Sequence, residues 1–439
     1  MIPILSLDAM RAADHDAVGR RSQDALVHAA GTAVAQTARH MLGTCYGAHI
    51  AVIAGPGLNG ADGRVAAAWL RDRGAQVEVI TWSDAPSMLA GFDLIVDAAF
   101  GTGCSRPYVA PRVTAGTRVL AVDLPSGVDT DTGALLGEPM IATVTLALGA
   151  LKPAHLNGPA ADFVGELRFE GLDIVQSFVD GLMTDEDLAG FVHLNANDHK
   201  WNHAVQAFVG SSLMPGAAEL VLRGALAGGA SMIRLASRGD VSTQVNIPPE
   251  VVHATDATVD TRCKAVVAGP GLGPDASDWL RDSLSDLTCP VVLDADGLNR
   301  ELIDEHSPRD GSWVLTPHAG EFARLTGKDV GLDRFSSVRD LAEATGCVVL
   351  LKGPTTIISA PDGRLRVVTS GTASLATAGT GDVLAGFIAA TIARGHNSLE
   401  GAALGAFLHG RAGASLAPYA HASEVAASLA RLVGDLAGR

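Results

Sequence analysis

The clearest chemical motif in the chain is Leu375-Ala-Thr-Ala-Gly-Thr-Gly-Asp-Val-Leu-Ala-Gly386, which leads into an apolar helix. Gly379 and Gly381 permit a tight turn at the start of this helix, so we expect the N–H groups of Thr380, Gly381 and Asp382 to form an anion pocket. Beside a bound phosphate, the Asp382 carboxylate is placed to take the proton of a hydroxyl that is being phosphorylated. For a short Gly-x-Gly-Asp, a helix N-cap is the commoner explanation, but the longer motif favours catalysis.

Three glycine-containing loops, each following a predicted strand, point to the same site. They are Ala268-Gly-Pro-Gly-Leu-Gly273, Thr316-Pro-His-Ala-Gly-Glu321 and Leu351-Lys-Gly-Pro-Thr-Thr356. Ligands of open parallel sheets bind beyond the carboxyl ends of the strands, so these loops are expected to surround one cleft. Taken alone, His318 is more commonly a packed or capping residue and Lys352 a surface residue. Because all three loops are expected at one cleft, functional roles for His318 and Lys352 are favoured.

The first half of the chain carries its own strand-end motifs. Ala54-Gly-Pro-Gly-Leu-Asn-Gly-Ala-Asp-Gly63 follows a strand and opens a helix, with a glycine spacing that differs from the Rossmann Gly-x-Gly-x-x-Gly. Two further strands end in Asp97-Ala-Ala-Phe-Gly-Thr-Gly103 and Val122-Asp-Leu-Pro-Ser-Gly-Val-Asp129. Asn59, Asp97 and Ser126 supply hard oxygen ligands suited to potassium, and Asp123 is a candidate base. For any one of them, a cap or turn role is the commoner explanation.

Short apolar strands must position these loops. We predict strands at 49–55, 77–81, 94–97, 119–123 and 144–148 in the first half, and at 205–209, 232–236, 265–268, 291–294, 313–315 and 348–351 in the second. Helices are predicted at 64–73, 217–226 and 382–393. The strands are continuously apolar rather than alternating, which is typical of parallel sheets covered on both faces.

Length and composition limit the number of domains and the kinds of partner that we expect. The 439 residues, 47% of them hydrophobic, predict two domains, at 1–175 and 196–439, joined by an acidic linker at 176–195. A net charge of −16 disfavours nucleic acid and anionic membranes as partners. Five dispersed cysteines without a CxxC pair, no signal peptide and no long apolar run lead us to expect a cytoplasmic protein without a membrane span. We also expect a homo-oligomer.

The second half resembles the ADP/ATP-dependent NAD(P)H-hydrate dehydratases, a branch of the ribokinase-like fold. The matching runs are Pro215-Gly-Ala217, Gly269-Pro-Gly-Leu-Gly273, Leu293-Asp-Ala-Asp-Gly-Leu-Asn299, Pro317-His-Ala-Gly-Glu321, Lys352-Gly-Pro-Thr-Thr356 and Gly379-Thr-Gly-Asp382. They occur in family order. One departure is the run His199-Lys-Trp-Asn-His-Ala204, where the family usually has a glycine.

The resemblance implies roles for individual residues. Ala217, Gly271, His318 and Asp382 would contact the hydrated nicotinamide substrate, with Asp382 as the base that activates its ring hydroxyl. The adenine nucleotide, ADP or ATP, would be held by Lys352, Gly353, Pro354, Thr355, Thr356 and Gly381. Phosphorylation makes the hydroxyl a good leaving group, and elimination restores the dihydropyridine ring. Magnesium is expected with the nucleotide.

The first half, from about residue 5 to 172, resembles the NAD(P)H-hydrate epimerase domain. That resemblance implies that potassium is bound by Asn59, Asp97 and Ser126 and that the reaction interconverts the R and S hydrates. The implied substrate-binding residues are Asn59, Gly60, Ala61, Asp62, Gly101, Thr102, Gly103, Arg106 and Asp123, the last of which would be catalytic. The implied architecture of the whole chain is α/β: an N-terminal Rossmann-like three-layer αβα sandwich followed by a ribokinase-like αβα domain.

Two departures keep alternatives open. The family usually has Asn-Asn-Gly-Gly-Asp where this chain has Leu58-Asn-Gly-Ala-Asp62, so Leu58 removes a polar contact. Ala61 would be strained if that position requires a positive φ. The first half could therefore be a non-catalytic binding module. For the second half, the alternative is a ribokinase-like kinase of a small molecule, because kinases of this fold share the Gly-Thr-Gly-Asp helix.

Overall fold

The computed structural model describes residues 1–191, 197–254, 257–285 and 287–437. The chain divides into two compact units. The N-terminal unit comprises Ile2–Asp180 with Gly331–Phe335, and the C-terminal unit comprises Gly181–Val330 and Ser336–Arg439 with Met1. Among the described residues, none of the helices combines the length and the apolar character that a membrane crossing requires.

The N-terminal unit is built on a parallel sheet with the strand order β11-β10-β8-β5-β2-β3. Its strands are β2 (His49–Ala54), β3 (Gln76–Thr81), β5 (Leu94–Ala98), β8 (Arg118–Val122), β10 (Val144–Leu148) and β11 (Glu166–Glu170). The first five confirm the strands predicted from apolar runs, to within one residue at each end.

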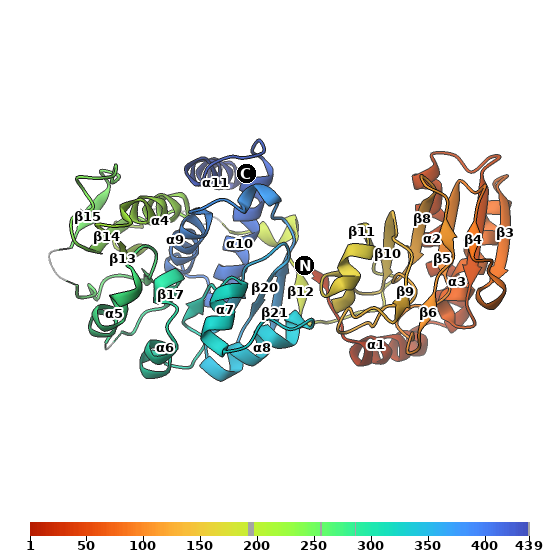
Figure 1. Ribbon diagram of the computed structural model, residues 1–439, viewed down its shortest axis with the longest axis horizontal. Coiled ribbons are helices and arrows are strands. Elements are labelled where there is room, and N and C mark those ends of the chain that lie inside the picture. Colours follow the sequence, from red (N-terminus) through yellow and green to blue (C-terminus); the bar gives the residue numbers. More distant parts are fainter. Residues whose placement is uncertain (192–196, 255–256, 286, 438–439) are drawn as a thin grey trace. The chain divides into compact units, whose positions relative to one another are not determined.

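One face of this sheet packs against α2 (Gln23–Leu42) and α3 (Leu58–Arg71), whose alanine-rich sides allow close approach (Figure 1). The other face packs against a smaller cluster that includes Leu89, Tyr108 and Met140. Short strands accompany it, namely β4 (Met88–Leu89), β6 (Tyr108–Val109), β7 (Arg112–Val113) and β9 (Gly137–Glu138). The unit also contains β1 (Ile2–Pro3), α1 (Leu7–Arg20) and short 3-10 turns at Trp82–Asp84, Pro153–His155 and Pro159–Phe163.

The C-terminal unit has a larger mixed sheet with the order β12-β21-β20-β19-β18-β17-β16-β13-β14-β15. Its strands are β12 (Gly181–Leu182), β13 (Ala204–Ser211), β14 (Met232–Arg238), β15 (Val251–His253), β16 (Ala265–Ala268), β17 (Val291–Leu293), β18 (Val314–Leu315), β19 (Val348–Leu351), β20 (Thr356–Ser359) and β21 (Leu365–Val368). Strands β13 to β19 run parallel, whereas β20 is antiparallel to both β19 and β21.

Helices lie on both faces of this sheet (Figure 1). The larger core packs against α4 (Pro215–Ala227), α9 (Thr380–Ala393), α10 (Ser398–Ala414) and α11 (Ala422–Ala437). The opposite face carries α5 (Ser277–Ser283), α6 (Arg300–His306), α7 (Ala319–Thr326) and α8 (Arg334–Thr345).

The predicted start of one helix was wrong. The helix expected at 64–73 begins at Leu58, because the glycines of the preceding motif are themselves helical and let α3 approach β2 and β5 closely. The expected linker at 176–195 contains the strand β12 and a 3-10 turn at Asp185–Leu188. A two-residue strand leaves no periodic pattern in the sequence. Positions 192–195 of that linker lie outside the described residues.

Helices α4 and α9 cross almost backbone to backbone, and glycines make this possible. A Cβ atom added to Gly386 would lie 2.0 Å from the carbonyl oxygen of Val221, and one added to Gly224 would lie 2.1 Å from that of Val383. No real Cβ tolerates such distances, so a side chain at either position would push the helices apart. The crossing therefore fixes the start of α9 relative to the start of α4.

We predict that Gly386→Ala destabilises the C-terminal unit. Overpacking of this kind costs about 1–3 kcal/mol, which corresponds to a fall in Tm of roughly 2–12 °C for a unit of this size. Gly434→Ala is the matched control, since it lies in α11 and a Cβ there meets no described atom within 4 Å. Alanine forms helices more readily than glycine does, so the Tm of Gly434→Ala should equal or exceed that of the wild type. Equal Tm values for the two variants in differential scanning calorimetry would contradict the packing argument.

Candidate functional site

In the C-terminal unit, charged residues gather where parallel strands end. Asp294 directly follows β17 and is only 2% exposed, and Lys352 directly follows β19. The Lys352 Nζ lies 2.7 Å from Asp294 Oδ1 and 3.6 Å from Glu321 Oε2. Burial lowers the pKa of Lys352, but the two carboxylates outweigh that effect and raise it, so the ammonium stays charged.

The first turn of α9 faces this ion pair. Gly379, the N-cap, has a left-handed φ of +88°, as the sequence motif predicts. A Cβ on Gly381 would lie 3.5 Å from Lys352 Nζ and 3.6 Å from Asp294 Oδ2, so the helix start touches the pair. The Thr380 N–H, which we expected to form part of the anion pocket, instead donates to Thr377 O at 3.3 Å. This bond closes the turn before the helix.

Asp382 lies in that first turn, half-buried and close to other carboxylates. Burial, followed by the negative charge of Asp294, raises its pKa to about 7, while Lys352 acts in the opposite direction. Asp296 and Glu321 raise the pKa further. A carboxyl that titrates near neutral pH can exchange a proton with a bound hydroxyl, which is what a general base must do.

The predicted substrate residues of this half lie on several loops. Ala217 is in the first turn of α4, and a Cβ on Gly271 would lie 2.5 Å from its Cβ, so these two residues are neighbours. His318 is the N-cap of α7: its Nδ1 accepts from the N–H groups of Gly320 and Glu321, and Glu321 accepts in return from the His318 N–H. Its ring therefore has a capping role in addition to the predicted contact with substrate.

A cavity of about 520 Å³ opens beside the ion pair and the start of α9. Of the residues expected to hold an adenine nucleotide, Lys352, Gly353, Pro354, Thr356 and Gly381 line it, whereas Thr355 is not among the lining residues. The remaining walls are largely apolar and include Val368, Leu375, Ala376, Leu384 and Ala406. Its size and its mixture of apolar walls and one cation fit a small nucleotide.

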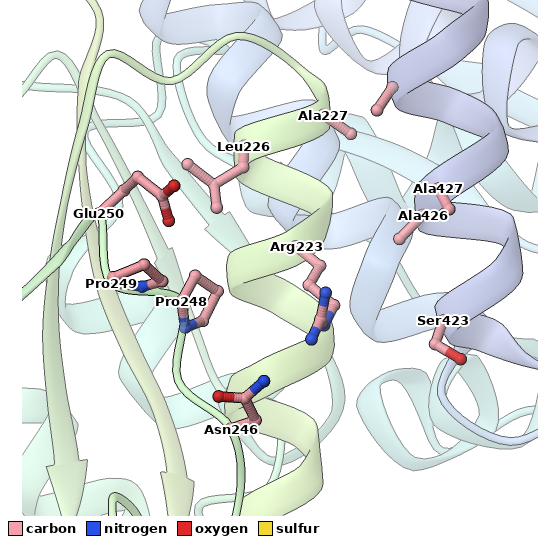
Figure 2. Close-up of a pocket in the computed structure, with 11 residues that line it drawn as sticks. Arg223, Leu226, Ala227, Asn246, Pro248, Pro249, Glu250, Ser423, Ala426 and Ala427 are labelled. Carbon is pink, nitrogen blue, oxygen red and sulfur yellow. The ribbon is translucent and has the colours of Figure 1, made fainter.

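Another cavity of the same unit, about 400 Å³, lies between α4, α11 and residues 246–250 (Figure 2). Its walls are mainly alanine, leucine and proline side chains, and its one arginine, Arg223, is paired with Glu219 at 2.7 Å. It adjoins the carboxyl-terminal half of α4, whereas Ala217 lies at the start of that helix. The side chains that line it do not form an acid–base or metal-binding group.

In the N-terminal unit, the predicted glycine motif forms the start of α3. Asn59, Gly60, Ala61 and Asp62 lie in its first two turns, and a Cβ on Gly60 would be 2.0 Å from Gly55 O. Ala61 lies within the helix and is absent from the positive-φ residues, so the strain considered for this position does not occur. The departure from the family sequence at Ala61 is therefore compatible with an intact local backbone.

Asp123 is held in an unusual conformation by a buried network. It directly follows β8, has a φ of +66°, and its Oδ1 accepts from the Leu148 N–H at 3.1 Å and from Lys152 Nζ. His155 Nε2 lies 2.6 Å from the Asp123 carbonyl oxygen, while His155 Nδ1 accepts from the Lys152 N–H. Burial and then Lys152 lower the pKa of His155 to about 4, so the neutral ring donates to that carbonyl.

These residues line a cavity of about 120 Å³. Asp14, Asn59, Asp62, Thr102, Asp123 and Lys152 supply its polar side, and apolar residues of α1 and α2 such as Met10 and Leu26 supply the other. Burial, then the charges of Asp123 and Asp14, raise the pKa of Asp62 to about 8. Sequence reasoning missed Asp14, Lys152 and His155. Lys152 lies four residues beyond a predicted strand, a signal that could have found it.

The other predicted N-terminal residues are divided between this cavity and the surface. Gly101 lies against the Asn59 side chain, because a Cβ there would be 2.5 Å from Asn59 Oδ1. Gly103 and Arg106 are exposed and do not line the cavity. The structure thus brings Thr102 and Gly101 to the site but leaves Gly103 and Arg106 outside its walls.

The proposed potassium ligands are only partly assembled. Asp97 is fully buried, with Oδ1 accepting from Ser126 Oγ at 2.6 Å and Oδ2 from the Ser126 N–H at 2.9 Å. Asn59 donates instead to Val122 O at 2.7 Å, which leaves its Oδ1 facing Gly101. Asp97 and Ser126 are therefore in direct contact, whereas the Asn59 side chain is bonded to the end of β8.

Each of the two units matches a known protein family. The family model described as NAD(P)H-hydrate dehydratase matches residues 205–433, and the model described as YjeF-related protein N-terminus matches residues 23–91 and 84–154. A bifunctional NAD(P)H-hydrate repair enzyme Nnr of Mycobacterium leprae is 35% identical over 425 residues, which cover 89% of this chain and 88% of the relative. One from Thermofilum pendens is 34% identical over 463 residues, covering 89% and 87%.

Among solved structures, the ADP/ATP-dependent NAD(P)H-hydrate dehydratase from Bacillus subtilis, co-crystallized with ATP/Mg2+, has a TM-score of 0.53 and 28% identity. The match covers 58% of this chain and 97% of that one. The expected two-domain α/β fold with a ribokinase-like C-terminal domain is confirmed. The chain belongs to the family of bifunctional NAD(P)H-hydrate repair enzymes.

Proposed function

We propose that the C-terminal unit dehydrates the S form of NAD(P)H hydrate at the expense of ADP or ATP, and that the N-terminal unit interconverts the R and S forms. The observation that carries the first activity is a carboxyl with a pKa of about 7, Asp382, at the helix start that touches Lys352 and Asp294. The nucleotide cavity opens beside it. A vitamin or sugar kinase of the same fold is less well supported, because the relatives that span most of this chain are repair enzymes.

The dehydration would proceed in two steps. Asp382 takes the proton of the substrate's ring hydroxyl while that oxygen attacks the terminal phosphoryl group of the nucleotide. The phosphate then leaves the ring carbon, the ring nitrogen supplies the electrons, and loss of a proton from the adjacent carbon restores the dihydropyridine. The N–H groups at the start of α9 and the ammonium of Lys352 stabilise charge on the transferred group.

The carboxylates at this site fit a magnesium ion that arrives with the nucleotide. Asp294, Asp296 and Glu321 offer oxygen ligands, which magnesium prefers. Among residues 1–191, 197–254, 257–285 and 287–437, however, no group of three or more His, Cys, Asp or Glu is arranged to hold a metal ion alone. Magnesium bound mainly through phosphate oxygens and one or two carboxylates agrees with both observations, and it would neutralise phosphate charge.

Asp382→Asn should abolish dehydration without preventing nucleotide binding. The amide fills the same space but cannot accept the proton, so kcat should fall about 100-fold or more. The rate is followed by the absorbance of the restored dihydronicotinamide with ADP or ATP, and nucleotide binding by calorimetry. The two nucleotides in parallel also establish which one is used. Turnover close to that of the wild type would remove Asp382 from the mechanism.

The dehydratase should also be governed by one ionisation near neutral pH. Because the base must be ionised and burial raises the pKa of Asp382 to about 7, kcat/KM measured below saturation should rise with pH and level off above pH 7. Below the pKa the slope should approach about tenfold per pH unit. A kcat/KM that is flat between pH 6 and 8 would contradict this assignment.

The N-terminal cavity contains the groups that an epimerisation needs. The ammonium of Lys152 stabilises negative charge on Asp123, whereas Asp62, with a pKa near 8, carries a proton at neutral pH. Asp123 would remove the proton of the hydroxyl as Asp62 protonates the ring nitrogen, which breaks the carbon–nitrogen bond and leaves an aldehyde. Rotation about a single bond and the reverse proton transfers close the ring on the other face.

Potassium would be held by Asp97 and Ser126, with Asn59 as the third ligand. The donor set consists of hard oxygen atoms, and the fully buried Asp97 carboxylate is bonded only by uncharged partners among the described residues, Ser126 and Ala99. Burial raises the pKa of Asp97, so a cation beside it would favour the ionised form. The ion would supply positive charge at the strand ends.

Asp123→Asn should remove epimerisation and leave dehydration of the S form intact, because the two cavities belong to different units. Asparagine tolerates the left-handed backbone at this position better than alanine does. Conversion of the pure R form is measured by chromatography, and dehydration of the pure S form by absorbance. Glu78→Ala, an exposed change in β3, is the control. Equal loss of both activities would argue against two independent sites.

A further inference from the structure

The dehydratase site has a surplus of negative charge on its substrate side. Asp294, Asp296 and Glu321 all raise the pKa of Asp382, and Lys352 is already paired with Asp294 and Glu321. NAD(P)H hydrate is a dinucleotide with an ionised diphosphate between its two halves. With its nicotinamide ring at Asp382, a diphosphate that extends along the same sheet edge would be stabilised there by a cation.

The Gly269–Gly273 loop offers a surface that a ligand can approach closely. Gly269, Gly271 and Gly273 have φ angles of +120°, +67° and +88°, which only glycine adopts readily. The loop is fixed at one end by the contact of Gly271 with Ala217, and at the other by the Gly273 N–H, which donates to Asp296 Oδ2 at 2.8 Å. It therefore lies between the start of α4 and the acidic cluster.

Arg238 is the cation attached to this loop. It is the last residue of β14, it is half-buried, and its Nη1 donates to the Leu272 carbonyl oxygen at 3.0 Å. A Cβ on Gly273 would lie 3.9 Å from the same nitrogen. Within the described residues, no carboxylate lies within 4 Å of its guanidinium. Arg324 also lies near Asp296 but is exposed and contacts Ala295 O instead of the loop.

We propose that Arg238 binds the diphosphate of NAD(P)H hydrate over the Gly269–Gly273 loop, and that it thereby makes the dehydratase select dinucleotide over mononucleotide hydrates. The inference rests on the proposed dehydratase function. The bond to Leu272 O holds the side chain in place while the other guanidinium N–H groups are free to pair with phosphate oxygens. Arg238 is a binding residue, remote from the reacting carbon.

The test compares Arg238→Gln with the full-length wild type on two substrates, hydrated NADH and hydrated reduced nicotinamide mononucleotide, which lacks the diphosphate. Loss of charge-assisted bonds worth about 1.5–3 kcal/mol should raise KM for hydrated NADH about 10- to 100-fold. The kcat should stay within about twofold, and KM for the mononucleotide should change little. The KM of Arg238→Lys for hydrated NADH should lie between those of the wild type and Arg238→Gln. Lysine keeps the positive charge but lacks the paired N–H groups of the guanidinium.

Arg364→Gln is the matched control. It removes the same charge from an exposed arginine that pairs with Asp362 in the turn between β20 and β21, and it should leave both KM values unchanged. Calorimetric titration of hydrated NADH without nucleotide measures binding directly. It should show a weaker Kd for Arg238→Gln even if turnover is not observed.

The possible results of these experiments distinguish failure of the Arg238 inference from failure of the proposed dehydratase function. Absence of turnover by the wild type, with hydrated NADH bound more weakly by Arg238→Gln, would refute the dehydratase assignment and keep the binding role. Turnover by the wild type with an unchanged NADH-hydrate KM in Arg238→Gln would overturn the inference alone. Equal losses on both substrates would also overturn it, because they would mean that Arg238 only supports the loop.

Discussion

A buried lysine–aspartate ion pair beside a second, partly protonated aspartate is the arrangement on which both sites depend. The members are Lys352, Asp294 and Asp382 in the C-terminal unit and Lys152, Asp123 and Asp62 in the N-terminal unit. In each case the lysine pairs most closely with the first aspartate, and at the C-terminal site it also approaches Glu321. The second aspartate meets burial and a neighbouring negative charge. Both effects favour its neutral form, and its pKa rises to about 7 or 8. Each site can therefore move protons near neutral pH.

Backbone packing brings these groups together. The ion-paired aspartates follow the parallel strands β8 and β17, and the second aspartates lie at helix starts that contact the same strand ends. Close packing by glycine is the shared device: Gly60 lets α3 approach the end of β2, and Gly386 lets α9 cross α4. A side chain at either position would force the helix away from its neighbour, and with it the start of the helix that carries the proposed acid–base carboxyl.

Much of this could be predicted from the sequence, because apolar runs and glycine motifs report local structure directly. The strands that end at Asp123, Asp294 and Lys352 are among those predicted, and Asp382 lies at the start of α9 as its motif indicates. Asp14 was missed because it comes from α1, which has no motif and approaches the site only through tertiary packing. The pairing of Lys352 with Asp294 joins residues 58 positions apart, and no local pattern encodes it. The prediction of a homo-oligomer stays a prediction.

The account depends most on the protonation state of Asp382, which carbon-13 NMR of aspartate-labelled protein measures directly, with Asp382→Asn to assign the signal. The account predicts a carboxyl resonance that titrates with a midpoint near pH 7 in the free enzyme. A side chain that remains fully ionised down to pH 5 would contradict it, because the buried, negatively charged surroundings on which the proposed base depends would then be absent.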